Sequence, residues 1–174
     1  MGKLLKIVAG GSLVLAGLTG PVAARAEFSD PELAERVVDA IQHHGSFGMF
    51  DDVTISVENR VVTIRGHVTR PAKKEDIARR VARIEGVRQV VNDIQVLPIS
   101  PADDDLRLRV ARAIYNHPSF WQYASMAQPP VHIIVEHGHI TLTGRVGTQL
   151  DRSLAYALAQ VPGALSVGNE LKVE

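Results

Sequence analysis

An internal repeat is the feature that most constrains the fold, because one unit of about 70 residues occurs twice in the same order. LAERVVDAIQHHGSF (33–47) recurs as LRLRVARAIYNHPSF (106–120), at an offset of 73 residues. VTISVENRVVTIRGHV (53–68) recurs as VHIIVEHGHITLTGRV (131–146), at an offset of 78. A third block, IEGVRQVVNDIQV (84–96), is matched at an offset of 77. The sequence therefore predicts two similar small domains, with a longer loop in the second copy after Phe120.

Hydrophobic periodicity predicts the same elements in each copy. Leu33, Val37 and Ile41 form one apolar stripe at helical spacing, and alternating residues over 53–58 predict a half-buried strand. Two-residue hairpin turns are expected at Asn59-Arg60 and His137-Gly138, and the second helix of each copy is expected to end at Gly86 and Gly163. Phe120, which matches Phe47 of the first copy, is expected in the core of the second domain.

The expected fold class is α+β, with two tandem small α-β-β-α-β domains. Each domain is predicted to have a three-stranded sheet with two helices on one face. We place the first domain at residues 30–98, a Pro-stiffened linker at 99–102 and the second domain at 103–174.

Residues 1–26 have the pattern of a secretory signal peptide. Lys3 and Lys6 precede an uncharged apolar stretch over 7–20, and Ala24-Arg25-Ala26 fits a cleavage site. The stretch is shorter than the roughly 20 residues of a membrane span, although an uncleaved N-terminal anchor is the alternative. We expect cleavage after Ala26 and a periplasmic or secreted product.

The charge balance and the absence of Cys exclude several classes of function. The 19 basic and 19 acidic residues become 16 and 19 once residues 1–26 are removed, a net charge of −3 that argues against nucleic acid as a partner. No Cys is present, which excludes disulfides, thiolate catalysis and Cys-ligated metal.

The repeated unit resembles the BON domain, named for bacterial OsmY and nodulation proteins. The resemblance rests on the element order, on VTIRGHV and ITLTGRV with their strand glycines Gly66 and Gly144, and on IEGVRQVVNDIQV and VPGALSVGNELKV. It covers residues 30 to 174. The segment 121–130 matches no family motif. The resemblance implies a non-enzymatic envelope module of the periplasm or outside the cell, linked to osmotic or envelope stress and proposed to bind phospholipid.

No catalytic or metal-binding pattern stands out. The chain has no G-x-S-x-G, no phosphate-binding glycine loop and no H-E-x-x-H. The acidic run at 103–105 opens a helix, where a capping role is favoured over paired-carboxylate chemistry. His137, His139 and Glu136 share a hairpin, but solvated turn histidines are preferred to a metal site. We expect no enzyme activity, metal or cofactor.

Two groups of residues are candidates for lipid binding. Five cations lie on or beside the second helix of the first copy: Lys73, Lys74, Arg79, Arg80 and Arg83. Trp121 and Tyr123 lie in the longer segment of the second copy, and such side chains favour membrane interfaces. The alternatives are a solvated helix face for the cations and packing for the aromatic residues.

The leading hypothesis is an exported, peripheral module that binds anionic phospholipid at the envelope. The runner-up is a periplasmic protein–protein adaptor or stress protein that uses the open faces of its sheets and does not bind lipid. In the first copy that face contains Val61, Thr63, Arg65 and Val91, and in the second it contains Ile134, His139, Thr141 and Arg145. The sequence leaves open which residues these faces contact and the oligomeric state.

Overall fold

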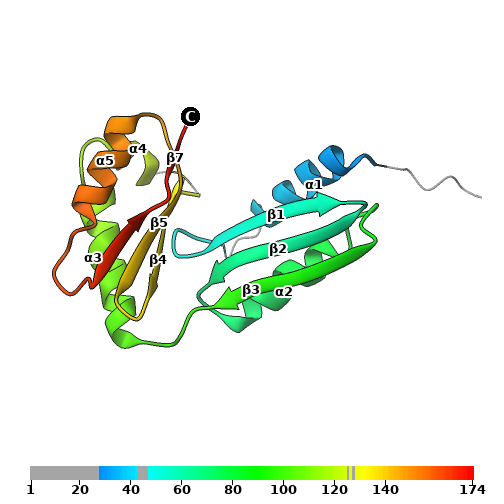
Figure 1. The fold of residues 1–174 in the computed structure, drawn as a ribbon, viewed down its shortest axis with the longest axis horizontal. Helices are drawn as coiled ribbons and strands as arrows, with labels where there is room; N and C mark the ends of the chain where they lie inside the picture. Colours follow the sequence, from blue (N-terminus) through cyan, green and yellow to red (C-terminus); the bar gives the residue numbers. More distant parts are fainter. Residues whose placement is uncertain (1–27, 43–46, 125, 127) are drawn as a thin grey trace, which may run out of the picture.

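The computed structural model describes residues 28–42, 47–124, 126 and 128–174, so the predicted signal peptide lies outside the described residues. Domain 1 comprises α1(Asp30–Gln42), β1(Asp52–Glu58), β2(Val61–Val68), α2(Pro71–Val81) and β3(Gln89–Val96). Domain 2 comprises α3(Pro101–Tyr115), α4(Trp121–Ala124), β4(Val131–Glu136), β5(His139–Val146), α5(Gln149–Leu158), β6(Ser166–Asn169) and β7(Lys172–Val173). The α+β class, the tandem arrangement and the element order are confirmed (Figure 1).

The sheet of domain 1 has the order β1-β2-β3. β1 and β2 form an antiparallel hairpin in which Glu58 pairs with Val61, so Asn59 and Arg60 make the predicted two-residue turn. Both turn residues have positive φ, 51° and 62°, as a turn matching the twist of the strands requires. β3 returns parallel to β2 because α2 crosses over between them.

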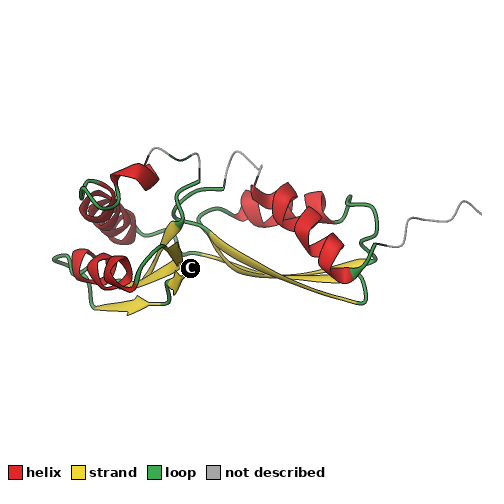
Figure 2. Ribbon diagram, turned by 90° about the horizontal axis from the view of Figure 1, so that it is seen from above, coloured by secondary structure: helices red, strands yellow, loops and turns green. Residues whose placement is uncertain are grey.

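The sheet of domain 2 repeats this topology with one break. β4 and β5 form the hairpin around His137 and Gly138, and β6 and β7 both run parallel to β5. Together β6 and β7 span 166–173, which matches β3 at the offset of 77, so they are one strand interrupted at Glu170 and Leu171. Figure 2 shows the helices on one side of the sheets, as predicted.

Each domain has its own apolar core between sheet and helices. The largest buried side chains of domain 1 are the helix residues Leu33 and Ile77 and the strand residues Ile64 and Ile94. The core of domain 2 includes Phe120, which is fully buried. The repeat therefore encodes two separate cores.

Gly66 and Gly144 are required by close backbone approach. Their φ angles are +123° and +101°, and a Cβ at either position would lie 2.0 Å from a backbone oxygen, that of Asp52 or Pro130 respectively. Because the contacting atom is backbone, no side-chain movement relieves the clash. These glycines have a structural role in both domains.

Two local expectations differ from the structure. Regular α2 ends at Val81 and not at Gly86, because irregular turns with short-range hydrogen bonds such as Ile84 N to Val81 O fill the gap. The longer segment of the second copy forms the short helix α4. Phe47, the match of Phe120, is half-buried, and its ring faces His132 of domain 2 and not the core of domain 1.

Candidate functional site

Lys73 is held inside domain 1 by the carboxylate of Asp51. The Asp51 side chain is 0% exposed, and its Oδ2 lies 2.6 Å from Lys73 Nζ. Asp51 also accepts from the Gly48 amide at 2.9 Å, and from the amide and hydroxyl of Thr69 at 3.0 and 3.1 Å. This ion pair occupies Lys73, so its ammonium group is not presented on the predicted lipid-binding face.

The other cations around α2 lie nearer the surface. Lys74 is half-buried, and its carbonyl oxygen accepts a hydrogen bond from Asn92 Nδ2 at 3.1 Å. Arg79 is exposed and ion-paired with Asp76. Arg80 and, in the turn after α2, Arg83 are exposed and have no ion-pair partner among the described residues. We call Arg79, Arg80 and Arg83 the basic patch.

The neighbouring helix α1 has the opposite charge. It exposes Glu32, Glu35 and Asp39, with Arg36 as its one cation, and it contacts α2. The helical face of domain 1 is therefore divided into an acidic and a basic half. An anionic surface would be attracted from the α2 side and repelled from the α1 side.

The two aromatic candidates are placed differently from each other. Trp121 is 74% exposed at the start of α4. Tyr123 is half-buried, packs against the core of domain 2, and its ring centroid lies 6.1 Å from that of Phe120. The structure thus presents Trp121 to solvent and turns Tyr123 inward, and neither joins the basic patch of domain 1.

The histidine hairpin has ordinary polar contacts. His139 Nδ1 lies 2.7 Å from Ser166 Oγ, and His137 Nδ1 lies 4.0 Å from Glu136 Oε1. Across the residues described by the structure, no group of three or more His, Asp or Glu side chains is arranged to hold a metal ion.

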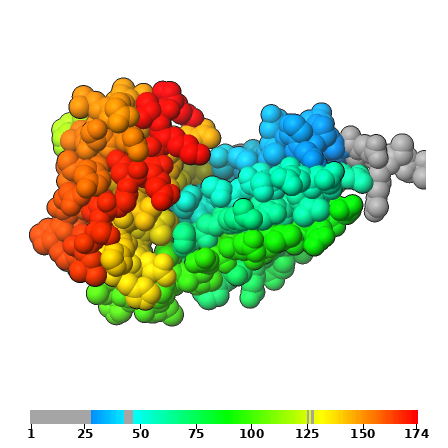
Figure 3. Space-filling model, in the orientation of Figure 1, coloured from blue at the N-terminus to red at the C-terminus, as the bar shows by residue number. Residues whose placement is uncertain are grey.

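The two domains meet through residues 47–51, which we call the junction segment. The Ile133 amide of β4 donates to the Met49 carbonyl oxygen at 2.7 Å, and Met49 and Phe50 pack against the core of domain 2. The Phe47 ring lies 5.6 Å from the ring of His132. In Figure 3 the yellow residues around β4 lie against the cyan and green surface of domain 1. The two sheets thus meet near β1 and β4 rather than face to face.

His132 of β4 is a titratable group at this junction, next to the carboxylates of Asp51 and Asp52. Its ring is half-buried, and Nδ1 is buried without a hydrogen-bond partner among the described residues. Burial lowers the pKa of His132, and the carboxylates of Asp52 and Asp51 oppose that shift without reversing it. The neutral ring is therefore favoured while the domains are in contact.

In each domain, one aspartate at the start of the first helix accepts hydrogen bonds from the backbone of the hairpin turn. Asp30 accepts from the Asn59 and Arg60 amides at 2.7 and 2.9 Å. Asp103, its match at the offset of 73, accepts from the His137 and Gly138 amides at 3.0 and 2.8 Å. Burial opposes the charge of Asp103, but these amides lower its pKa on balance. The sequence pattern predicted only a helix-capping role for this acidic run.

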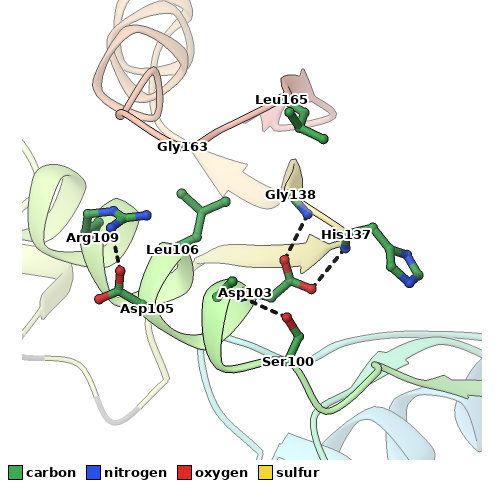
Figure 4. Close-up of a pocket in the computed structure, with 10 residues that line it drawn as sticks. Ser100, Asp103, Asp105, Leu106, Arg109, His137, Gly138, Gly163 and Leu165 are labelled. Atoms are coloured by element: carbon green, nitrogen blue, oxygen red, sulfur yellow. Dashed lines mark hydrogen bonds and ion pairs between the residues drawn. The ribbon is translucent and has the colours of Figure 1, made fainter.

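A surface hollow of about 460 Å³ lies beside Asp103 in domain 2 (Figure 4). Leu106 and Arg109 of α3 line one side, and Gly138 of the hairpin with Gly163 and Leu165 line the other. Arg109 is ion-paired with Asp105, and its Nε is buried without a partner among the described residues. No sequence pattern singled out this hollow, because its residues come from three separate segments.

The chain is thus a tandem α-β-β-α-β protein. Each of its two domains has one glycine in the second strand and another before the last strand. A sequence model of the BON domain family matches residues 29–98 and again residues 102–174. The chain belongs to the BON domain family and contains two copies of the domain.

Further comparisons add little. No curated protein matches the chain. Among solved structures, it matches CdsD, a structural protein of the type III secretion system of Chlamydia trachomatis, at 15% identity over 80% of this chain and 92% of that one, with a TM-score of 0.28. It also matches the C-terminal domain of CdsD at 14% identity over 84% of this chain and 100% of that one, with a TM-score of 0.31. Similarities this weak support no argument about function.

Proposed function

We propose that this protein is an exported, non-catalytic BON module that associates with the cell envelope by binding anionic phospholipid headgroups. BON domains occur in envelope and osmotic-stress proteins and are in general non-catalytic, and the sequence of residues 1–26 supports export. The observation that carries the lipid assignment is the basic patch, where Arg80 and Arg83 are exposed with no ion-pair partner in the described part of the chain. None of the helices described is long and apolar enough to cross a bilayer. Binding would therefore be peripheral.

The expected affinity is modest. A cation near an anionic surface contributes about 1 kcal/mol, so Arg80 and Arg83 would together contribute about 2 kcal/mol, and Arg79, which is ion-paired with Asp76, would add less. Such binding is reversible and weakens as salt screens the charges. Lys74 at the edge of the patch would add to it, whereas Lys73 is engaged with Asp51. Trp121, exposed on domain 2, offers a separate interfacial contact.

Vesicle co-sedimentation tests the proposal. The protein should sediment with vesicles of phosphatidylglycerol and phosphatidylcholine at low salt, but not with phosphatidylcholine alone and less at high salt. The variant R79Q/R80Q/R83Q should lose most of this binding. Arg65→Gln is the matched control, because Arg65 is an exposed arginine on the opposite side of the same sheet. Binding that is absent at low salt, or unchanged in the triple variant, would remove the lipid assignment.

The adaptor hypothesis is the second candidate, and one observation favours it. The outer face of sheet β1-β2-β3 is covered by no helix or strand in the described ranges, and Thr63 and Val91 pair at its centre beside Val61. A protein partner that binds this face would be recovered in a pull-down from envelope extract. Thr63→Lys should abolish its recovery while leaving vesicle binding intact.

A further inference from the structure

Phe28, just before α1 of domain 1, has no aromatic counterpart at the matching position of domain 2. Phe28 lies over Gly86, where an added Cβ would be 2.8 Å from Phe28 Cδ2 and 3.6 Å from Leu33 Cδ1. The guanidinium carbon of Arg36 lies 3.7 Å from the centre of the Phe28 ring. The Phe28 ring therefore lies against Gly86 and under the guanidinium of Arg36, and the buried Leu33 is beside the same glycine.

The same three residue types recur at matched positions in domain 2. Gly86 matches Gly163 at the offset of 77, and Leu33 and Arg36 match Leu106 and Arg109 at the offset of 73. All three matched residues line the 460 Å³ hollow beside Asp103. Gly163 also has the same backbone conformation, with φ +93° against +97° at Gly86. The hollow is therefore the counterpart of the Phe28 site, formed by equivalent residues.

No residue of the described chain takes the place of Phe28 in domain 2. The position that matches Phe28 is Pro101, the first residue of α3. The preceding linker leads away toward domain 1, and its Ile99 is 96% exposed. A Cβ on Gly163 would instead lie 3.0 Å from Arg109 Nη2, so the guanidinium lies where the ring lies in domain 1.

We propose that this hollow binds an aromatic side chain presented by a partner polypeptide. The ring would enter between Gly163 and the guanidinium of Arg109, which would move outward to cover it as Arg36 covers Phe28. Leu106 forms the floor, and the exposed side chain of Leu165 adds an apolar wall that domain 1 does not have, because Arg88 is there. An arginine over a ring face and apolar contacts below it favour Phe, Tyr or Trp over an aliphatic residue.

The occupant is assigned as a polypeptide because the occupant of the matching site is itself the side chain of a residue in this chain. In domain 1 the Phe28 segment leads directly into Ser29 and α1. The proposal does not depend on lipid binding, since the hollow is in domain 2 and the basic patch is in domain 1.

Nuclear magnetic resonance of the full chain, with N-acetyl-phenylalanine amide as the probe, tests the site. The amide signals of Gly138 and Gly163 should shift saturably, with a dissociation constant in the millimolar range for so small a probe. The amide of Gly86, whose site Phe28 already fills, should not move. N-acetyl-alanine amide should produce no comparable shift.

Variants of the lining residues separate this site from nonspecific binding. Arg109→Gln should weaken probe binding about two- to fivefold, the effect of losing one cation–π contact, whereas Arg112→Gln on the same helix should not. Ala102→Phe, at an exposed position beside the hollow, should fill it and abolish binding without unfolding the domain. The assignment is overturned if Gly163 does not respond, if the alanine probe acts equally, or if A102F still binds. It is also overturned if raising the protein concentration alone shifts these signals, because the occupant would then be a second copy.

Discussion

Replacing Lys73 by Ala removes the cation that pairs with the buried carboxylate of Asp51. Asp51 is 0% exposed, and the Lys73 side chain is only 11% exposed. Breaking a buried ion pair from one side costs about 3–5 kcal/mol, because the remaining charge stays buried without a partner. Asp51 keeps three hydrogen bonds, from the Gly48 amide and from the amide and hydroxyl of Thr69, so we expect the lower end, about 3 kcal/mol.

That loss is a large part of the stability of a small domain, which is about 5–15 kcal/mol. A domain of this size loses roughly 4–8 °C of melting temperature for each kcal/mol, so K73A should lower the melting temperature of domain 1 by about 12–24 °C. Circular dichroism would follow the melting of the whole chain. The fluorescence of Trp121, the single tryptophan, would follow domain 2 separately.

Two further variants make the measurement decisive. Arg80→Ala should change the stability by no more than about 0.5 kcal/mol, as expected for an exposed side chain. The double variant D51A/K73A should be less destabilised than the sum of D51A and K73A, because removing both partners leaves no buried charge. If K73A were as mild as Arg80→Ala, Lys73 would be a surface cation and the argument that excludes it from the basic patch would be wrong.

Three other perturbations have definite expected results. Gly66→Ala would place a Cβ 2.0 Å from the Asp52 carbonyl oxygen, so domain 1 should lose more than about 3 kcal/mol in a denaturant titration. Because the pKa of Asp103 is lowered in the folded protein, its contribution to stability is complete above the ordinary pKa of 3.8 and is lost as the pH falls through the lowered value. In an acid titration of stability, D103N should lack this loss. The control D104N should retain it. His132 also has a lowered pKa, so contact between the domains should be strongest above pH 6.5 and should weaken as the pH falls through the lowered value. The chemical shift of the Ile133 amide should report this weakening in the native chain. In H132F the same shift should stay constant.

The repeat and the hydrophobic periodicity were sufficient to predict the helices and strands of both domains. Each element is determined mainly by residues close to it in sequence, and the second copy repeats the pattern of the first. The hairpin turns and the stripe through Leu33, Val37 and Ile41 follow from local backbone preference and burial. Gly66 and Gly144 could be singled out from their recurrence, although the carbonyl oxygens that require them are visible only in the structure.

The candidate site was less predictable, since contacts between distant segments determine it. Helical spacing placed Lys73 beside the other cations of α2, but its partner Asp51 is 22 residues earlier and outside any periodic element. Phe47 has the sequence environment of Phe120, yet its ring faces His132 of the other domain. The equivalence between the Phe28 site and the hollow in domain 2 also required knowing which residues lie over Gly86.

The hydrogen bond from Ile133 to Met49 has a consequence for handling this protein in parts. β4 is an edge strand, and an uncovered edge strand is a template for pairing with the strands of other molecules. The junction segment covers part of that edge, and the buried Asp51 fixes the segment to domain 1. Cutting the chain between the domains would therefore expose the edge of β4 to pairing with other molecules. Domain 2 produced alone should self-associate or aggregate, unless a charged residue is introduced on β4 to prevent that pairing.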